Sequence, residues 1–324
     1  MTDSKLVSVG QIPLLKEMTR EVAAMAPTKE RFLDAAVDIR QEPDDYELAY
    51  MARELVQCTL PHSNPGDIPV WTRTNGNIRL VIVRTTYDSK KQKLVGFPYG
   101  STPRLLLFWM TTEAVQTGKR RLELGDSYAG FLRDIGLDPS TGGGKRSDAA
   151  RVKEQTRRLF GAAIGIQKSE SVNGLEHEQV GKMLVSSKSE LWWDPKSPEQ
   201  LAMWGSWVEL GEDFYKTITT APVPADMRAL RVLKRSPLAL DLYVWATYKA
   251  LTARRKGKPL YVPWQGLMKQ FGADYGDPKD FRKKAIAKLK MIQAVYPGLK
   301  LADASGGLQI LPTSTPAIPT KSPS

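Results

Sequence analysis

The predicted helix from Asp280 to Val295 carries lysine side chains at a spacing that could bind a polyanion. At about 100° per residue, its apolar side chains fall on one face, and Lys279, Lys283 and Lys290 fall opposite, around the small Ala287. A face of this kind can enter the major groove of DNA, which is about 12 Å wide. We therefore expect this helix to contact duplex DNA through Lys279, Arg282, Lys283, Lys284 and Lys290.

A second basic helix is predicted from Ser147 to Ala163. Its period directs Arg151 and Arg158 outward, with Arg157 beside them. Arginine can bind guanine through a bidentate contact, whereas lysine more often anchors phosphate. For either helix alone, a plain solvated face is an equal alternative. The DNA-contacting residues expected in this half of the chain are Lys145, Arg146, Arg151, Arg157, Arg158 and Lys168.

Both basic helices end the same series of predicted elements, and each is followed by a predicted β-ribbon. The first copy comprises Pro103–Gly118, Leu122–Leu124, Tyr128–Ile135 and Ser147–Ala163. The second copy comprises Pro237–Arg255, Leu260–Val262, Gln265–Phe271 and Asp280–Val295. Helix, strand, helix, turn, helix, ribbon is the order of a winged helix-turn-helix. We predict an α+β fold with two tandem winged helix-turn-helix domains, preceded by a helical N-terminal segment and a β-hairpin.

The segments around the two copies give further predictions. Glu47 to Gln57 has the period of an amphipathic helix, and the strands flanking Asn75-Gly76-Asn77 predict a β-hairpin, because Asn and Gly tolerate positive φ. A long wing is expected around Asn173-Gly174, formed by Ile164–Ser171 and Lys182–Trp193. Ser206 to Thr219 has the composition of a strand.

These elements divide the chain into four predicted parts. Residues 1–60 form a partly flexible helical segment, and residues 61–220 form the first winged-helix domain with its long wing. Ala221 to Pro224 is the expected linker to the second domain, residues 221–311, which should provide most of the DNA binding. Residues 312–324 are rich in Pro, Ser and Thr, and we expect this tail to be disordered.

Charge supports a polyanion partner. The chain has 47 Lys and Arg against 35 Asp and Glu, a formal net charge of +12. The stretch from Ser236 to Lys300 holds 13 Lys and Arg against 4 Asp and Glu, a net of +9, so most of the excess lies in one fifth of the chain. Neutralising phosphates with clustered cations releases counterions from DNA. A merely basic surface is the alternative, and the lack of an interfacial aromatic stripe disfavours membrane binding.

Sequence patterns for catalysis, metals and cofactors are weak. Gly142-Gly143-Gly144-Lys145 is not a P-loop, because Arg146 follows where Ser or Thr is needed. His62 and His177 are the only histidines and Cys58 is the only cysteine, which disfavours a zinc site or a hydrolase triad. We expect no enzyme activity, cofactor or metal. One cysteine, no signal peptide and no long apolar stretch favour a reducing, cytoplasmic location, which the resemblance described below would place in a bacterium.

The tryptophan-rich stretch from Leu191 to Ile218 has two interpretations. Its rings could stack on bases, but at strand spacing beside leucines they are more typical of a core or a subunit interface. We expect this stretch and the strand Arg79–Val83 to form a dimer surface. The predicted dimer residues are Trp192, Trp193, Trp207 and Phe214.

Three ordered blocks of the sequence resemble one known family. The first runs from Gly96 to Leu107, and the second combines Thr141-Gly142-Gly143 with Gln155, Arg158, Leu159 and Phe160. The third runs from Pro222 to Trp245 and includes Ser236-Pro237-Leu238-Ala239-Leu240-Asp241-Leu242-Tyr243. Over roughly residues 60 to 312 the chain resembles the RepA-type plasmid replication initiators of Gram-negative bacteria.

The resemblance implies a non-enzymatic initiator of plasmid replication. Such proteins bind direct repeats (iterons) in double-stranded DNA at the origin, help to open adjacent A·T-rich DNA, and recruit the host initiator and the replicative helicase. They commonly switch between a dimer and an origin-active monomer, so the chain itself is an expected partner. Shared tandem winged helices would be a fold-level analogy only.

From these observations we predict that Lys279–Lys290 occupies the major groove and that the first module contacts the neighbouring turn, about 34 Å away. The alternative function is a winged-helix transcriptional repressor, including one that regulates its own promoter. A relaxase or nuclease is disfavoured, because a relaxase needs clustered histidines near a tyrosine, and His62 and His177 are far apart in sequence.

Overall fold

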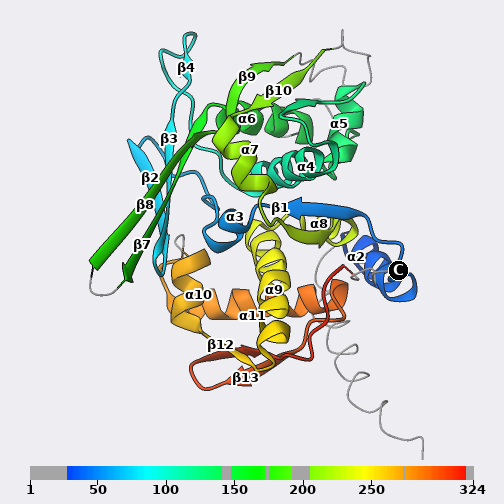
Figure 1. Ribbon diagram of the computed structural model, residues 1–324. Coiled ribbons are helices and arrows are strands. Elements are labelled where there is room, and N and C mark those ends of the chain that lie inside the picture. The colour runs from blue at the N-terminus through cyan, green and yellow to red at the C-terminus, as the bar shows by residue number, and fades with distance from the viewer. Residues whose placement is uncertain (1–27, 141–146, 173–174, 192–204, 273–274, 319–324) are drawn as a thin grey trace, which may run out of the picture.

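The structure is a computed structural model that describes residues 28–140, 147–172, 175–191, 205–272 and 275–318. It has a mixed α+β fold in which helices pack with small antiparallel sheets (Figure 1). In the view of Figure 1, the elements of the first copy lie above those of the second, and a longer four-stranded sheet runs along the left side. One continuous hydrophobic core contains residues of both copies, such as Phe108 and Trp245.

The second copy follows the predicted order of elements. It comprises α9 (Pro237–Lys256), β12 (Leu260–Pro263), α10 (Trp264–Phe271), α11 (Pro278–Val295), β13 (Leu301–Ala304) and β14 (Gly307–Ile310). The three strands form one antiparallel sheet in the order β12-β14-β13, with Ile310 opposite both Leu260 and Leu301. The short strand before α10 is therefore joined to the hairpin that follows α11.

The first copy has the same element order but a different sheet. It comprises α4 (Ser101–Thr117), β6 (Arg121–Glu123), α5 (Tyr128–Asp134), α6 (Asp148–Phe160), β7 (Ala162–Val172) and β8 (Leu175–Leu184). Strand β6 pairs with β10 (Trp207–Leu210), which also pairs with β9 (Ser186–Glu190). The ribbon β7–β8 instead extends the sheet β2-β3-β7-β8. The predicted first strand of the ribbon, Ile164–Ser171, lies within β7, but its partner is Leu175–Leu184 rather than the predicted Lys182–Trp193. The ribbon also belongs to another sheet than β6.

The predicted β-hairpin is confirmed. Strands β2 (Val70–Asn75) and β3 (Ile78–Arg84) pair antiparallel, with Asn75 opposite Ile78 across the tight turn. Strand β3 pairs with β7 on its other side, so Arg79 to Val83 lies in the interior of the sheet rather than at an edge. The segment after β3 forms the small strands β4 (Tyr87–Asp88) and β5 (Lys93–Leu94).

The prediction of one helix from Glu47 to Gln57 is wrong. The chain forms α2 (Thr28–Gln41), then strand β1 (Leu48–Met51) and only afterwards the short helix α3 (Arg53–Gln57). Strand β1 pairs antiparallel with β11 (Val223–Asp226), so a distant partner overrides the local helical period. The expected linker Ala221–Pro224 is corrected too, because its second half belongs to β11, which leads into α8 (Met227–Leu233).

The predicted strand from Ser206 to Thr219 is also wrong beyond Leu210. After β10 the chain turns into α7 (Glu212–Thr219), a helix with Glu212 and Asp213 in its first turn. Gly211 marks the break, because a Cβ at this position would lie 2.2 Å from the carbonyl oxygen of Leu184. Acidic residues in a first turn are favourable beside the positive end of the helix dipole.

The first part of the C-terminal tail is ordered, contrary to the expectation of disorder from residue 312. Tyr296 donates a hydrogen bond from its hydroxyl to the Thr315 carbonyl at 2.7 Å, and Ser314 is buried. The Thr315 amide donates to the Gly298 carbonyl at 3.0 Å. These contacts fix residues 312–318 beside the end of α11, and residues 319–324 lie outside the described residues. Among the described residues, no helix has the length and apolar character needed to cross a membrane.

Candidate nucleic-acid interface

Helix α11 is held so that its basic face points away from the core. Asp277 caps the helix by accepting a hydrogen bond from the Lys279 amide at 2.8 Å, and Pro278 occupies the first turn. Phe281, Ala285, Leu289 and Ile292 are buried, as the helical period predicts. The Phe281 ring also packs edge-on against Tyr275, with ring centroids 5.6 Å apart.

The opposite face of α11 exposes the predicted cations. Lys279, Arg282, Lys283 and Lys284 are exposed, and Lys290 is half-buried. Lys284 is paired with Asp280 at 2.8 Å, and this hydrogen bond raises the pKa of Lys284. Arg282 lies over the Trp264 ring, with 5.5 Å to its centroid. Lys283 has no ion pair within the described part of the chain, so its charge is available to a ligand.

The second copy exposes further cations that the sequence analysis did not select. Arg254, Arg255 and Lys256 end α9, Lys258 follows them, and all four are exposed. The sequence signal was present, since basic residues in the last turn complement the negative end of a helix dipole. Lys269 on α10 is exposed as well.

Fewer basic side chains of α6 are exposed to solvent than predicted. Arg158 does not point outward: its side chain is only 14% exposed, and it donates to Glu154 at 2.9 Å and to the Phe97 carbonyl at 3.1 Å. Its guanidinium also lies over the Tyr99 ring. The cause is the segment from Thr85 to Gly100, which packs along the helix.

Other contacts extend this cover. Arg157 is bonded to Asp88 at 3.3 Å, and the Tyr99 amide donates to the Gln155 side chain at 3.0 Å. Arg151 remains exposed but is paired with Asp148, and Lys168 lies 3.8 Å from a carboxylate oxygen of Glu54. The predicted contacts Lys145 and Arg146 lie outside the described residues.

Of the four residues predicted for a dimer surface, the structure describes Trp207 and Phe214, and neither is exposed. Phe214 is 1% exposed and belongs to the core, because α7 turns it inward. Trp207 is half-buried under Arg121, whose guanidinium lies 4.2 Å from the ring centroid. Trp192 and Trp193 lie outside the described residues. Dimerisation itself stays a prediction.

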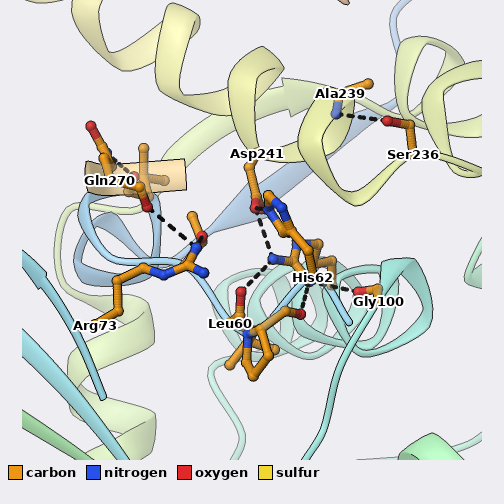
Figure 2. Close-up of polar contacts among 12 residues, drawn as sticks. Leu60, His62, Arg73, Gly100, Ser236, Ala239, Asp241 and Gln270 are labelled. Carbon is orange, nitrogen blue, oxygen red and sulfur yellow. Dashed lines mark hydrogen bonds and ion pairs between the residues drawn. The ribbon is translucent and has the colours of Figure 1, made fainter. Parts of the chain in front are cut away.

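A buried ion pair joins the first helix of one copy to that of the other (Figure 2). Arg104 of α4 donates from Nε and Nη2 to the two carboxylate oxygens of Asp241 on α9, at 2.7 and 2.8 Å. The same guanidinium donates to the carbonyls of Leu60, Pro61 and Gly100, so its donors are satisfied.

His62 completes this buried network. Its Nε2 lies 2.8 Å from Asp241 Oδ2. Burial lowers the pKa of His62, the hydrogen bond with Asp241 opposes this shift, and nearby Arg104 acts in the same direction as burial. Burial alone would raise the pKa of Asp241, but Arg104 and His62 outweigh it and hold the value at about 2. The pair is ionised at neutral pH and fixes α4 against α9.

A second group of polar contacts joins α10 of the second copy to α3 and β2, which precede the first copy. The Gln270 side chain donates to the carbonyls of Val56 and Gln57, at 3.1 and 3.0 Å. Arg73 of β2 donates to the Thr59 hydroxyl at 2.8 Å and to the Gln270 carbonyl at 3.3 Å (Figure 2). Within the described residues, no group of three or more His, Cys, Asp or Glu side chains could hold a metal ion.

The chain was compared with curated proteins and with solved structures. Among curated proteins, none matches the chain. Among solved structures, RctB domains 2–3 (residues 155–483) are similar with a TM-score of 0.43 and 12% identity, over 79% of this chain and 95% of that one. A selenomethionine derivative of RctB domains 2 and 3 gives a TM-score of 0.41 and 14% identity, over 77% and 93%. These two likenesses are too distant to assign a fold.

The family comparison is more informative. Residues 97–264 match the family model described as plasmid encoded RepA protein. The matched region runs from the segment that covers α6, through the buried pair Arg104–Asp241, to the start of α10. It spans just over half of the 324 residues, so the chain belongs to the family of plasmid encoded RepA proteins.

Proposed function

We propose that this protein initiates plasmid replication by binding direct repeats in duplex DNA at the origin, mainly through α11. Family membership supports a role in replication initiation. The observation that carries the proposal is the exposed row Lys279, Arg282 and Lys283 on a helix whose opposite face is anchored in the core. Cations fixed on a rigid helix neutralise phosphates with little loss of conformational entropy.

The second copy serves as a winged helix-turn-helix in this proposal. Its order of elements and its sheet β12-β14-β13 support that interpretation. In such modules the helix before the hairpin lies in the major groove. Helix α11 takes this role here, with Arg282 reading bases and the lysines holding phosphates.

The first copy has a secondary role at the DNA. Arg151 is its most exposed predicted contact, and Arg157 is only partly covered. We assign these two arginines and the ribbon β7–β8 to the neighbouring turn of the same repeat. Origin opening, recruitment of the host initiator and helicase, a dimer–monomer switch and the absence of enzyme activity extend the proposal on the family resemblance.

The test is a titration of the full chain against origin DNA at several salt concentrations. Replacing Lys279 and Lys283 together by alanine should weaken binding and reduce the slope of log K against log salt by about two, one per lost phosphate contact. The matched control is Lys119→Ala, an exposed lysine in the loop after α4. An unchanged slope in the double variant would remove α11 from the interface.

The arrangement of the target site separates initiator from repressor. Footprints over tandem direct repeats support the initiator, whereas tight binding to an inverted repeat alone would favour a repressor. Incubating supercoiled origin DNA with the protein and magnesium tests the non-enzymatic proposal, since nicking would overturn it.

A further inference from the structure

A cavity of about 1100 Å³ lies away from the helix proposed to bind DNA. Its walls come from α2, the start of α4, α6 and α8, with no residue from α10 or α11. It therefore lies where the first copy meets the elements that lead into the second. Small-ligand sites commonly occupy about 300–1,000 Å³ and favour such junctions, so this hollow has room for a ligand of nucleotide size.

The polar wall of the cavity is cationic. Two carboxylates, Asp138 and Asp148, face five cations. Asp148 is already paired with Arg151, and Asp138 accepts hydrogen bonds from the amide and the hydroxyl of Ser140. The five cations are Arg31, Arg151, Arg231, Lys234 and Arg235.

Part of the positive charge is not neutralised within the described residues, because three carboxylates (Asp148, Glu47 and Asp138) act on five cations. Arg231 is paired with Glu47, which is not part of the cavity wall. Arg31 and Arg235 are exposed and have no ion pair within the residues that the structure describes. Lys234 uses its ammonium to donate to the Gly136 carbonyl at 2.7 Å.

The cations also act on one another. Burial lowers the pKa of Lys234, the nearby Asp148 and Asp138 oppose this shift, and Arg235 and Arg31 lower the pKa by smaller amounts. The three like charges repel one another, and Asp148 and Asp138 counter this repulsion in the empty protein. A bound anion would relieve this repulsion.

The start of α4 adds hydrogen-bond donors to the same wall. Gly100 caps this 17-residue helix with φ of 79° and no side-chain hydrogen bond, and Ser101 and Thr102 line the cavity. Amides in the first helical turn favour anions such as phosphate. The rest of the wall is mostly apolar, formed by Leu105, Leu137 and Val232 together with Tyr99 and Gln155.

We propose that this cavity binds a nucleoside polyphosphate. The phosphates lie between Arg31, Arg235 and the first turn of α4, and the base lies against Leu137 and Val232. Its mixed wall distinguishes this site from the face of α11, because a purely phosphate-binding surface needs no apolar side. Because the walls come from α4 and α6 on one side and α8 on the other, the ligand would connect the first copy to the helix that leads into the second.

The test is isothermal titration of the full chain with ATP at low salt. Binding of the unmodified chain in the micromolar to low millimolar range is expected. The double variant Arg31→Gln, Arg235→Gln should bind at least about tenfold more weakly, because each removes one charge-assisted contact to phosphate. The matched control is Arg254→Gln, Arg255→Gln at the end of α9, which should bind ATP normally. Far-UV circular dichroism melts establish that all variants fold.

Three further probes define the ligand. Adenosine should bind more weakly than ATP, and inorganic tripolyphosphate should also bind more weakly because it does not contact the apolar wall. No ATP binding, or equal ATP binding by the unmodified chain and the double variant, would overturn the proposal. Equal affinity for tripolyphosphate and ATP would overturn the proposal that the base of the nucleotide packs against Leu137 and Val232. A thymidine hexanucleotide that binds through Arg31 and Arg235 when ATP does not would make the occupant a single strand instead.

Discussion

The two basic helices α6 and α11 have the same place in the element order but different surroundings. Helix α11 exposes Lys279, Arg282 and Lys283 to solvent. On α6, Arg158 is bonded to Glu154 and to the chain at Phe97. The difference arises from the segment Thr85–Gly100, which packs along α6. Amphipathic period determines which face is buried in the core, but a neighbouring segment determines whether the opposite face remains free.

The basic side chains of a helix can therefore either bind DNA or form stabilising contacts within the protein. Arginine suits both roles, because its planar guanidinium satisfies several acceptors at once. The lysines of α11 have few partners within the described chain, which is typical of a surface that receives phosphates. We therefore expect substitutions on α6 to change stability and substitutions on α11 to change affinity.

The largest effect on the free energy of unfolding is expected when the ion pair between α4 and α9 is broken. Asp241→Asn removes the charge that balances the buried Arg104, and loss of one partner of a buried pair costs about 3–5 kcal/mol. Because the pKa of Asp241 is about 2, below its ordinary 3.8, this stabilisation is present above pH 4 and is lost as the pH falls through 2. Urea unfolding at pH 7 measures the cost, with the exposed Asp213→Asn as control. A loss below about 1 kcal/mol would contradict the role assigned to this pair.

The next effect compares the two helices directly. Lys283→Glu reverses a free charge on α11 and should lower affinity for origin DNA about 10- to 100-fold. Arg151→Glu on α6 should lower it less than about threefold, because Arg151 is already paired with Asp148. Gel-shift titrations at one salt concentration give both values. Equal losses would mean that both copies contribute alike.

A smaller effect is expected at Arg158, and on stability rather than binding. Arg158→Ala leaves the Phe97 carbonyl without its donor and removes the packing on Tyr99, which should cost about 1–3 kcal/mol. The salt slope of DNA binding should stay unchanged. A flatter slope with unchanged unfolding would show that Arg158 reaches DNA despite its cover.

His62 provides a weaker, pH-dependent effect. Because burial lowers its pKa below 6.5, the unfolded chain takes up the proton first. Stability should therefore decrease as the pH falls below about 6.5, and His62→Gln should remove this part of the decrease. Thermal melts between pH 5 and pH 8 measure it. A histidine that stabilises more when protonated would give the opposite trend.

The smallest effect concerns Asp280 on α11. Its carboxylate pairs with Lys284 beside the DNA-binding face, so Asp280→Asn should raise affinity for DNA by less than about threefold. The melting temperature should hardly change, because both side chains are solvated. A lower affinity would indicate that Asp280 orders Lys284 for binding.

Local patterns predicted the elements of both copies, because helical periods and caps act over a few residues. The buried stripe of α11 and the hairpin at Asn75-Gly76-Asn77 are examples. The prediction was wrong at Leu48–Met51, where pairing with Val223–Asp226 overrides the local period. It was also wrong beyond Gly211, although the glycine followed by two acidic residues was a readable sign of a helix start.

The candidate site was predicted only in part, for the same reason. The exposed lysines of α11 follow from its period, whereas the cover of Arg158 depends on a segment about 60 residues earlier in the chain. The tail shows a similar limit, because its composition predicted disorder while Ser314 and Tyr296 hold it in place. Charge and composition predict whether a segment tends to be exposed or disordered, but contacts with residues distant in the sequence determine whether it is buried and ordered.

The strand pair β1–β11 has a consequence for synthesis on the ribosome. Leu48–Met51 has no completed pairing until the ribosome has added Val223–Asp226 and released them from its exit tunnel. The amino-terminal half must therefore wait, partly assembled, through the translation of some 170 residues, with apolar side chains accessible to chaperones. Rare codons placed after Asp226 would lengthen the time available for β1 to pair with β11. Termination of translation before Val223 would leave an aggregation-prone fragment in which β1 has no partner strand.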